Sequence, residues 1–313
     1  MVQKSNETSI KEFILEGFPA VQHRGRLLFV VHLVLYLVSM TGNTVIVILT
    51  WTDHRLQVPM YFFLSNFSLL EGCCITTIIP QLLTIFLSGA QTISFVACLT
   101  QFFFFIFWAS TGLFLLSVLS LDRYIAICNP LHYHSIMNRR VCFLLVLSCY
   151  ILGFILVFSL TLKMSALSFC GPNNIHHFFC DLGPLTHVSC SDASEVESLG
   201  FFFAMFIVLS SLAVSVISYI NILKTIAHLP SARERQKAFS TCSSHLIVLS
   251  VTYGSSVFMY VIPKQANRLD THGELVLVNT VATPVLNPFI YTLRNKQVKQ
   301  ALRDALYKIK LLR

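Results

Sequence analysis

Charged residues are scarce in this 313-residue sequence. Only 12% of the residues are Asp, Glu, Lys or Arg, while 55% are hydrophobic; soluble domains carry roughly 25% charged residues. A soluble protein of this composition would expose a large apolar surface to water, which is unfavourable. The composition therefore excludes an ordinary soluble protein and indicates that lipid surrounds the chain. The sequence also lacks low-complexity segments, internal repeats and a polar linker, so we expect a single domain, 1–313.

Seven apolar segments are long enough to cross a bilayer as helices, which takes about 20 residues each. The second contains Glu71, and the seventh contains Pro284 and Pro288. Proline is tolerated in membrane helices where neighbouring groups hydrogen-bond the freed backbone. We therefore predict an all-α membrane protein, a bundle of seven transmembrane helices, with spans at approximately 27–50, 59–86, 98–121, 141–162, 198–223, 238–262 and 275–293.

The distribution of Lys and Arg predicts the orientation of the bundle. With the N-terminus outside, the cytoplasmic segments hold 15 of the 22 basic residues and the outer segments hold 7, and the positive-inside bias favours this arrangement. Residues 1–26 are then extracellular, with a glycosylation sequon at Asn6, and no cleavable signal peptide is evident. Because the basic residues lie in loops between spans, we do not expect nucleic-acid binding.

Residues 294–313 would form a basic cytoplasmic tail. Its apolar residues recur at helical spacing with Lys and Arg between them, which predicts a short amphipathic helix on the anionic inner surface of the membrane. A disordered basic tail is the alternative. The apolar positions are Val298, Ala301, Leu302, Ala305, Leu306 and Ile309.

Short motifs distinguish among the receptors, transporters and channels that seven spans allow. Residues 119–133 read LSLDRYIAICNPLHY and resemble the olfactory receptor signature MAYDRYVAICxPLHY, with Leu-Ser-Leu in place of Met-Ala-Tyr. Residues 59–66 (PMYFFLSN), 237–246 (KAFSTCSSHL) and 284–295 (PVLNPFIYTLRN) match further motifs of that family. The motifs occur in order along the whole chain, which therefore resembles an olfactory receptor of the rhodopsin-like, G-protein-coupled class.

The resemblance implies a set of residues for activation and G-protein coupling. In this class the Arg corresponding to Arg123 is restrained near Asp122 in the inactive state and is freed when the sixth helix moves outward. Outside the motif, an Asp-Arg pair at a membrane boundary would be interpreted as an interfacial anchor. Pro288 removes a backbone donor, and we expect Asn287 to hydrogen-bond the freed groups. The set is Asp122, Arg123, Tyr124, Tyr219, His245, Asn287, Pro288 and Tyr291.

Glu71 is the acidic residue that lies deep inside a predicted span, and intramembrane carboxylates indicate function. The family usually has Asp at this position and a Glu nearby in the third helix, where this chain has Gly112. One carboxylate therefore stands where two are usual. Two interpretations remain open: coupling to sodium or protons, and a neutral, hydrogen-bonded Glu71, since burial away from water disfavours the charged form.

Four cysteines fall on the oxidising outer side, where disulfides persist, and four cysteines allow three pairings. The family pattern implies Cys98 with Cys180, which leaves Cys170 with Cys190 to close the outer loop on itself. The other six cysteines lie in spans or on the inner side and are expected to be free. Histidines near Cys180 and Cys190 have irregular spacing, so we predict no metal site.

Receptors of this class bind small ligands between the third, fifth, sixth and seventh helices. The residues of this chain at the corresponding positions would form an apolar, aromatic cavity with a few hydroxyl groups. Such a cavity suits a small, mostly neutral molecule. Phe105 stands where amine receptors carry an acid, which disfavours a cationic amine. Ordinary helix packing is the alternative for each position taken alone. The predicted lining residues are Phe105, Ile106, Ala109, Ser110, Phe203, Ile207, Tyr253, Ser256, Val257, Tyr260 and Thr280.

These observations predict a plasma-membrane olfactory receptor, in the cilia of olfactory neurons, that binds a volatile odorant and activates a stimulatory G protein of the olfactory type, raising cyclic AMP. A receptor for an endogenous metabolite in another tissue is the alternative. A transporter would need several polar residues along a path through the midplane, and the sequence offers only Glu71 and His245. We expect membrane lipid as a partner, no cofactor, and no enzymatic activity, because no nucleophile, base and orienting group come together.

Overall fold

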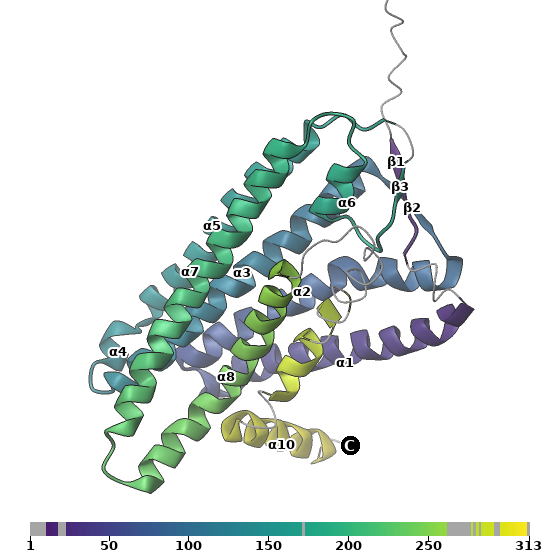
Figure 1. Ribbon diagram of the computed structural model, residues 1–313. Helices are drawn as coiled ribbons and strands as arrows, with labels where there is room; N and C mark the ends of the chain where they lie inside the picture. Colours follow the sequence, from purple (N-terminus) through teal and green to yellow (C-terminus); the bar gives the residue numbers. More distant parts are fainter. Residues whose placement is uncertain are drawn as a thin grey trace, which may run out of the picture.

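The computed structural model describes residues 11–17, 23–170, 173–261, 277, 280–281, 283–290 and 295–311. Long helices run alongside one another, with short strands at one end and a short helix near the other (Figure 1). The elements are β1 (Glu12–Leu15), α1 (Gly25–Thr52), the 3-10 helix η2 (His54–Leu56), α2 (Pro59–Ser88), β2 (Gln91–Ser94), α3 (Phe95–Cys128), α4 (Tyr133–Ile136), α5 (Arg139–Ser165), β3 (Asn174–Ile175), α6 (Leu182–His187), α7 (Ser194–Ala227), α8 (Ala232–Val261) and α10 (Lys296–Leu311).

Five of the described helices, α1, α2, α3, α5 and α7, are long and apolar enough to cross a membrane. They coincide with the first five predicted spans and extend most of them by a few residues. α8 covers the described part of the sixth predicted span, residues 238–261, and the described part of the seventh, residues 277, 280–281 and 283–290, is helical. The prediction of a multi-pass helical membrane protein is confirmed, while the full count of seven spans stays a prediction.

Local signals in the sequence set the ends of these helices. Ser94 caps α3 by accepting a hydrogen bond from the amide of Ala97, and Asn138 caps α5 in the same way through Val141. α2 starts with proline, whose missing N–H is harmless in the first turn. It ends at Gly89, whose φ of 86° is open to glycine at little cost.

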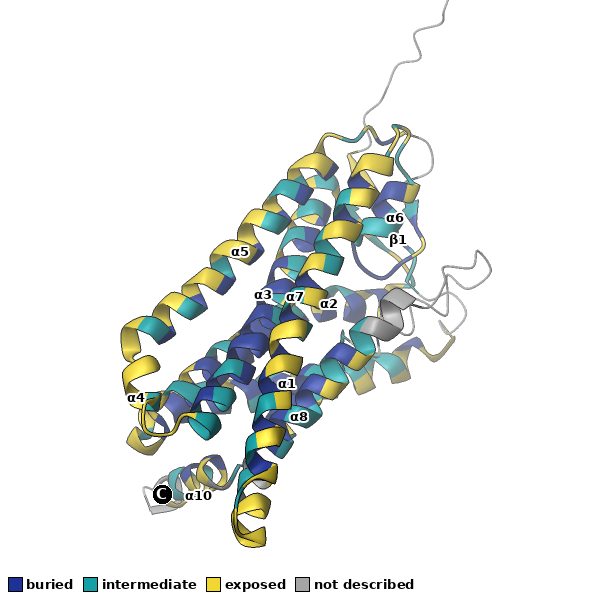
Figure 2. Cartoon of the chain, turned by 60° about the vertical axis from the view of Figure 1, so that its left-hand side comes forward, coloured by how far each residue is buried: buried dark blue, intermediate teal, exposed yellow. Residues whose placement is uncertain are grey.

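The outward faces of the long helices are apolar. On α5, Phe143, Ile151 and Ile155 are more than half exposed, and on α7 so are Phe201 and Ile217. Figure 2 shows the exposed surface running along the length of α5, whose buried residues are few. Large exposed apolar surfaces of this kind are rare on soluble proteins, whereas lipid would cover them.

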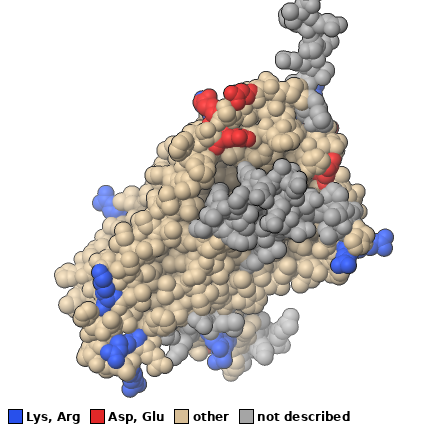
Figure 3. Space-filling model, viewed as in Figure 1, with Lys and Arg blue, Asp and Glu red and all other residues tan. Residues whose placement is uncertain are grey.

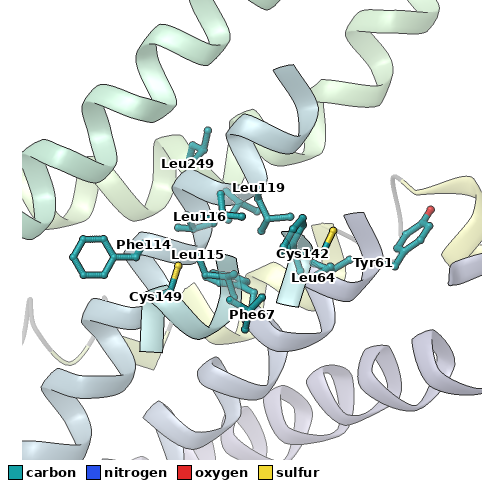
Figure 4. Packing of buried hydrophobic residues seen from close by; sticks show 14 of the residues in the cluster. Tyr61, Leu64, Phe67, Phe114, Leu115, Leu116, Leu119, Cys142, Cys149 and Leu249 are labelled. Carbon is teal, nitrogen blue, oxygen red and sulfur yellow. The ribbon is translucent and has the colours of Figure 1, made fainter. Parts of the chain in front are cut away.

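α3 lies at the centre of the bundle, packed against α2, α5, α7 and α8. A close view of this packing shows Leu115, Leu116 and Leu119 of α3 among side chains of neighbouring helices, including Phe67 (Figure 4). α3 and α5 approach closely at Gly153, where a Cβ atom would lie 2.5 Å from Thr111 Oγ1. The central position of α3 therefore brings four other helices against it.

A small sheet closes one end of the bundle, which we call the sheet end. β1 pairs antiparallel with β2 and parallel with β3, and it buries Phe13 and Leu15 completely. The all-α prediction did not include these strands. They are only two to four residues long, and their pairing joins segments far apart in the sequence, so no local periodicity marks them.

The opposite end, which we call the α10 end, carries α10 and the loops between α1 and α2 and between α3 and α5. α10 buries Val298 and Ala301 against the bundle, while Lys299 and Arg303 are exposed. Arg55 pairs with Asp53 at 2.6 Å and with Asp304 of α10 at 2.7 Å. In Figure 3 most Lys and Arg side chains lie toward the α10 end, and Asp and Glu lie toward the sheet end.

Candidate functional site

A cavity of about 670 Å³ opens within the bundle. α3 supplies one wall through Phe105, Ile106 and Ser110, and α7 supplies another through Phe203 and Ile207. The remaining walls come from α2, α5, α8, the segment around α6, and Thr280, Thr283 and Pro284. The size falls in the range of roughly 300–1,000 Å³ typical of small-molecule sites.

The structure brings together most of the predicted lining residues. Ile207 and Ser110 are buried, and Ala109 and Ser256 lie on the cavity surface. Tyr253 differs from the prediction: it is buried in the core and does not line the cavity, and its hydroxyl lies 3.4 Å from Ser215 Oγ. The side chains of Val257 and Tyr260 lie outside the described residues. The predicted residues that line the cavity are Phe105, Ile106, Ala109, Ser110, Phe203, Ile207, Ser256 and Thr280.

The cavity is mostly apolar, and its charged groups are all acidic. Among the described residues, the lining contains three carboxyl groups, those of Glu71, Asp181 and Glu197, and no Lys, Arg or His. Glu197 accepts a hydrogen bond of 2.6 Å from Thr186, and Asp181 caps α6. Sequence reasoning missed both, because Asp181 lies in the loop before α7, whose path over the bundle is not evident from sequence, and Glu197 lies in the first turn of α7, just outside the predicted span. The described part of the lining therefore offers an anionic ligand no positive charge.

A disulfide fixes this loop over the sheet end of the cavity. Cys98 at the start of α3 is joined to Cys180, and both residues are fully buried. Gln101, one turn further along α3, accepts a hydrogen bond of 3.0 Å from the Cys180 amide. These contacts place Phe179 against Phe105, with ring centroids 4.9 Å apart in an edge-on arrangement, and both rings line the cavity.

The second disulfide joins Cys170 to Cys190, the pair expected to remain once Cys98 is joined to Cys180. It lies closer to solvent, since both cysteines are exposed. The other six cysteines are free. In the described part of the chain no cluster of three His, Cys, Asp or Glu side chains could hold a metal ion, and Asn6 lies outside the described residues.

At the α10 end, a charged cluster forms where α3 ends. Arg123 binds the carboxylate of its neighbour Asp122, with Nε 3.0 Å from Oδ2. Tyr133 of α4 donates a hydrogen bond of 2.7 Å to the other carboxylate oxygen, Oδ1. Asp122 is fully buried, and these contacts supply hydrogen-bond partners to both of its carboxylate oxygens. Burial and the neighbouring carboxylate raise the pKa of Tyr133, which therefore stays a neutral donor. Tyr133 belongs to the quoted motif, but no pattern in the sequence indicates its contact with Asp122.

Two further polar contacts connect α7 to its neighbours below the cavity. The Tyr219 hydroxyl of α7 lies 2.7 Å from Nδ1 of His245 on α8, and both side chains are buried. Ser120 of α3 lies 3.1 Å from Ser215 of α7. Tyr124 is partly buried against the same core, and Tyr291 lies outside the described residues. α3, α7 and α8 are thus linked by hydrogen bonds that a relative movement of these helices would break.

The backbone group freed by Pro288 is not hydrogen-bonded by Asn287, as expected, but by α1. The carbonyl that it leaves without an in-helix donor is that of Pro284, four residues earlier. Ser39 and Asn43 of α1 hydrogen-bond this carbonyl at 2.9 and 3.2 Å. Asn287 instead donates a hydrogen bond of 2.7 Å to Glu71. The freed backbone group is therefore satisfied by a neighbouring helix, and Asn287 is available to bind the buried carboxyl group.

Comparison with known proteins agrees with this architecture. Residues 32–309 match the olfactory receptor family. The chain is 45% identical to human olfactory receptor 6C3 over 304 residues, which cover 97% of this chain and 98% of that protein. It is 48% identical to mouse olfactory receptor 6E1 over 301 residues, covering 96% of both chains. Human olfactory receptor 6C2 is 47% identical over 308 residues, covering 98% of each.

The helical bundle, its cavity and the charged cluster at the end of α3 define a G-protein-coupled receptor fold, which is not that of an enzyme. Within that class, the chain belongs to the olfactory receptor family.

Proposed function

We propose that this protein is an odorant receptor that binds a small, mostly apolar, neutral molecule in the cavity and activates a stimulatory G protein of the olfactory type. The observation that carries the proposal is the cavity itself: its walls are mostly aromatic and aliphatic, with a few hydroxyl groups from Ser110, Thr252, Ser255, Ser256, Thr280 and Thr283. A volatile molecule gains free energy from leaving water for such walls, at about 25 cal/mol for each Å² of apolar surface buried.

Signalling would follow from the hydrogen bonds between α3, α7 and α8. A ligand that fits the cavity better when these helices shift would stabilise the shifted arrangement. The Tyr219–His245 contact would then break, and Arg123 would leave Asp122 to contribute to the G-protein surface. We place the sheet end outside the cell and the α10 end in the cytoplasm, with seven spans, a glycan at Asn6, and α10 lying on the inner membrane surface of the cilia.

The test is a cyclic AMP assay in cells that express the full chain and the olfactory G protein, with a panel of volatile molecules. We expect a concentration-dependent rise for at least one volatile, and its loss in Arg123→Ala at matched surface expression. A response that Arg123→Ala retains in full would contradict the proposed coupling. The absence of any response from receptor at the cell surface would contradict the proposed ligand class or G protein.

A further inference from the structure

The cavity reaches deeper than the site predicted from the family positions. Along α3 its wall runs from Phe102 to Leu116, which is about 21 Å at 1.5 Å per residue. At the deep end α2 joins the wall through Phe67 and Glu71. We call this region the inner chamber and define it by Phe67, Glu71, Gly112, Leu113 and Leu116. α2 was not among the helices expected to line the ligand site.

Gly112 keeps the inner chamber open. Among the described residues, a Cβ atom at this position would meet only Phe67 Cε2, at 3.8 Å, so no other described side chain fills the space beside the helix. A glycine inside a helix costs roughly 1 kcal/mol relative to alanine. Since any larger side chain on this face of α3 would project toward Phe67, the glycine is what connects the main cavity to Glu71.

Glu71 presents an unpaired polar atom at this deep end. The side chain is 8% exposed, and its Oε1 accepts the hydrogen bond from Asn287. Its Oε2 is buried and has no hydrogen-bond partner among the described residues. A buried polar group without a partner is unfavourable. A ligand group that reaches Oε2 would therefore restore a missing hydrogen bond.

We infer that the inner chamber binds the hydroxyl group of an elongated aliphatic alcohol, whose chain lies along α3 in the main cavity. This inference rests on the proposed function and specifies its ligand class. A hydroxyl group can donate to a carboxylate or accept from a carboxylic acid, so it pairs with Oε2 in either state. An alkane of equal length leaves Oε2 unpaired. A fatty acid brings a negative charge beside Glu71, and no described residue of the lining is a Lys, Arg or His.

Infrared difference spectroscopy on the purified full-length receptor in lipid nanodiscs tests this contact without G-protein signalling. Decanol should change the carboxyl band of Glu71, identified by its loss in Glu71→Gln, and decane should not. Gly112→Leu should abolish the change, and Gly112→Ala should reduce it. Gly72→Ala is the matched control, because a Cβ there would make only ordinary contact with Met40, at 3.7 Å, away from the inner chamber.

A second readout uses potency in cells. Gly112→Leu should raise the half-maximal concentration of decanol about tenfold, as expected for one lost buried hydrogen bond, and should change that of hexanol less. No carboxyl-band change with any alkanol from hexanol to dodecanol, or a change that survives Gly112→Leu, would overturn the inference. A larger band change with decylamine than with decanol would overturn the ligand class. A band change without cyclic AMP would contradict the proposed function alone.

Discussion

Asn287 donates a hydrogen bond from Nδ2 to Glu71 Oε1 over 2.7 Å, joining α2 to the helical segment at 283–290. Both side chains are buried, and the contact lies at the base of the cavity. Oε2 of Glu71 has no partner among the described residues, so the bond from Asn287 is the hydrogen bond that this carboxyl group makes with them. The stability of the bundle should therefore be sensitive to it.

We expect Asn287→Ala to lower the free energy of unfolding by about 1–3 kcal/mol, because it leaves a buried carboxyl group without its donor. Thermal unfolding of the purified receptor measures the loss. The double variant Glu71→Leu/Asn287→Ala should recover part of it, since the orphaned carboxyl group is then removed. A double variant less stable than Asn287→Ala alone would contradict this interpretation.

Tyr133→Phe should raise basal signalling. The Tyr133 hydroxyl binds the carboxylate that holds Arg123, and a hydrogen bond to a charged group contributes about 1.5–3 kcal/mol. Without it, Arg123 should leave Asp122 more readily. Ligand-free cyclic AMP, normalised to surface receptor, measures the change. The exposed neighbour Ser135→Ala is the control; equal basal signals from the two variants would count against a restraint by Tyr133.

The two disulfides should differ in their contribution to stability. Cys98 and Cys180 are fully buried and close a loop between residues 82 apart, whereas Cys170 and Cys190 are exposed and only 20 apart. In the chain-entropy account the longer loop stabilises more, and loss of a native disulfide costs about 2–5 kcal/mol. Surface expression should fall much further in Cys98→Ser/Cys180→Ser than in Cys170→Ser/Cys190→Ser. The reverse order would be inconsistent with this account.

Arg55 should hold α10 against the loop after α1. Hydrogen bonding from Arg55 lowers the pKa of Asp53 to about 2, so Asp53 is charged at neutral pH. Arg55→Ala should speed amide hydrogen exchange in α10, by about fivefold or less because the pair is exposed. The exposed Arg303→Ala is the control. Because the pKa of Asp53 is depressed, the stabilisation from its pair with Arg55 is complete above pH 3.8 and declines as pH falls toward 2, so this part of the effect of Arg55→Ala should be constant near neutrality.

The long elements of the fold could be predicted from sequence, because length and apolarity alone identify a membrane span. The first five predicted spans match helices, and the helix ends lie only a few residues beyond them. The strands could not be predicted, since β1 pairs with residues in two distant loops. Phe13 and Leu15 of β1 are fully buried, although they lie in a segment expected simply to be extracellular.

The candidate site was predictable where a family position fixes a side chain on one helix face, as for Phe105, Ile106 and Ser110. It was not predictable where two separate segments must meet. The contact of Tyr133 with Asp122 depends on the path of a loop, and the opening beside Gly112 depends on how closely α2 approaches α3. A single glycine such as Gly112 forms no sequence pattern that would indicate the inner chamber.

If ligand binding in the cavity drives signalling, a side chain that fills the cavity should lower potency, and a matched pair of phenylalanine substitutions measures this. Ala109→Phe adds a ring to the cavity wall, whereas Val216→Phe adds one to the exposed face of α7. With an activating volatile, the half-maximal concentration for cyclic AMP should rise at least about tenfold in Ala109→Phe, a loss of about 1.4 kcal/mol of binding free energy. Val216→Phe should match the unsubstituted receptor at equal surface expression. Equal potency for Ala109→Phe and Val216→Phe would contradict signalling driven by ligand binding in the cavity.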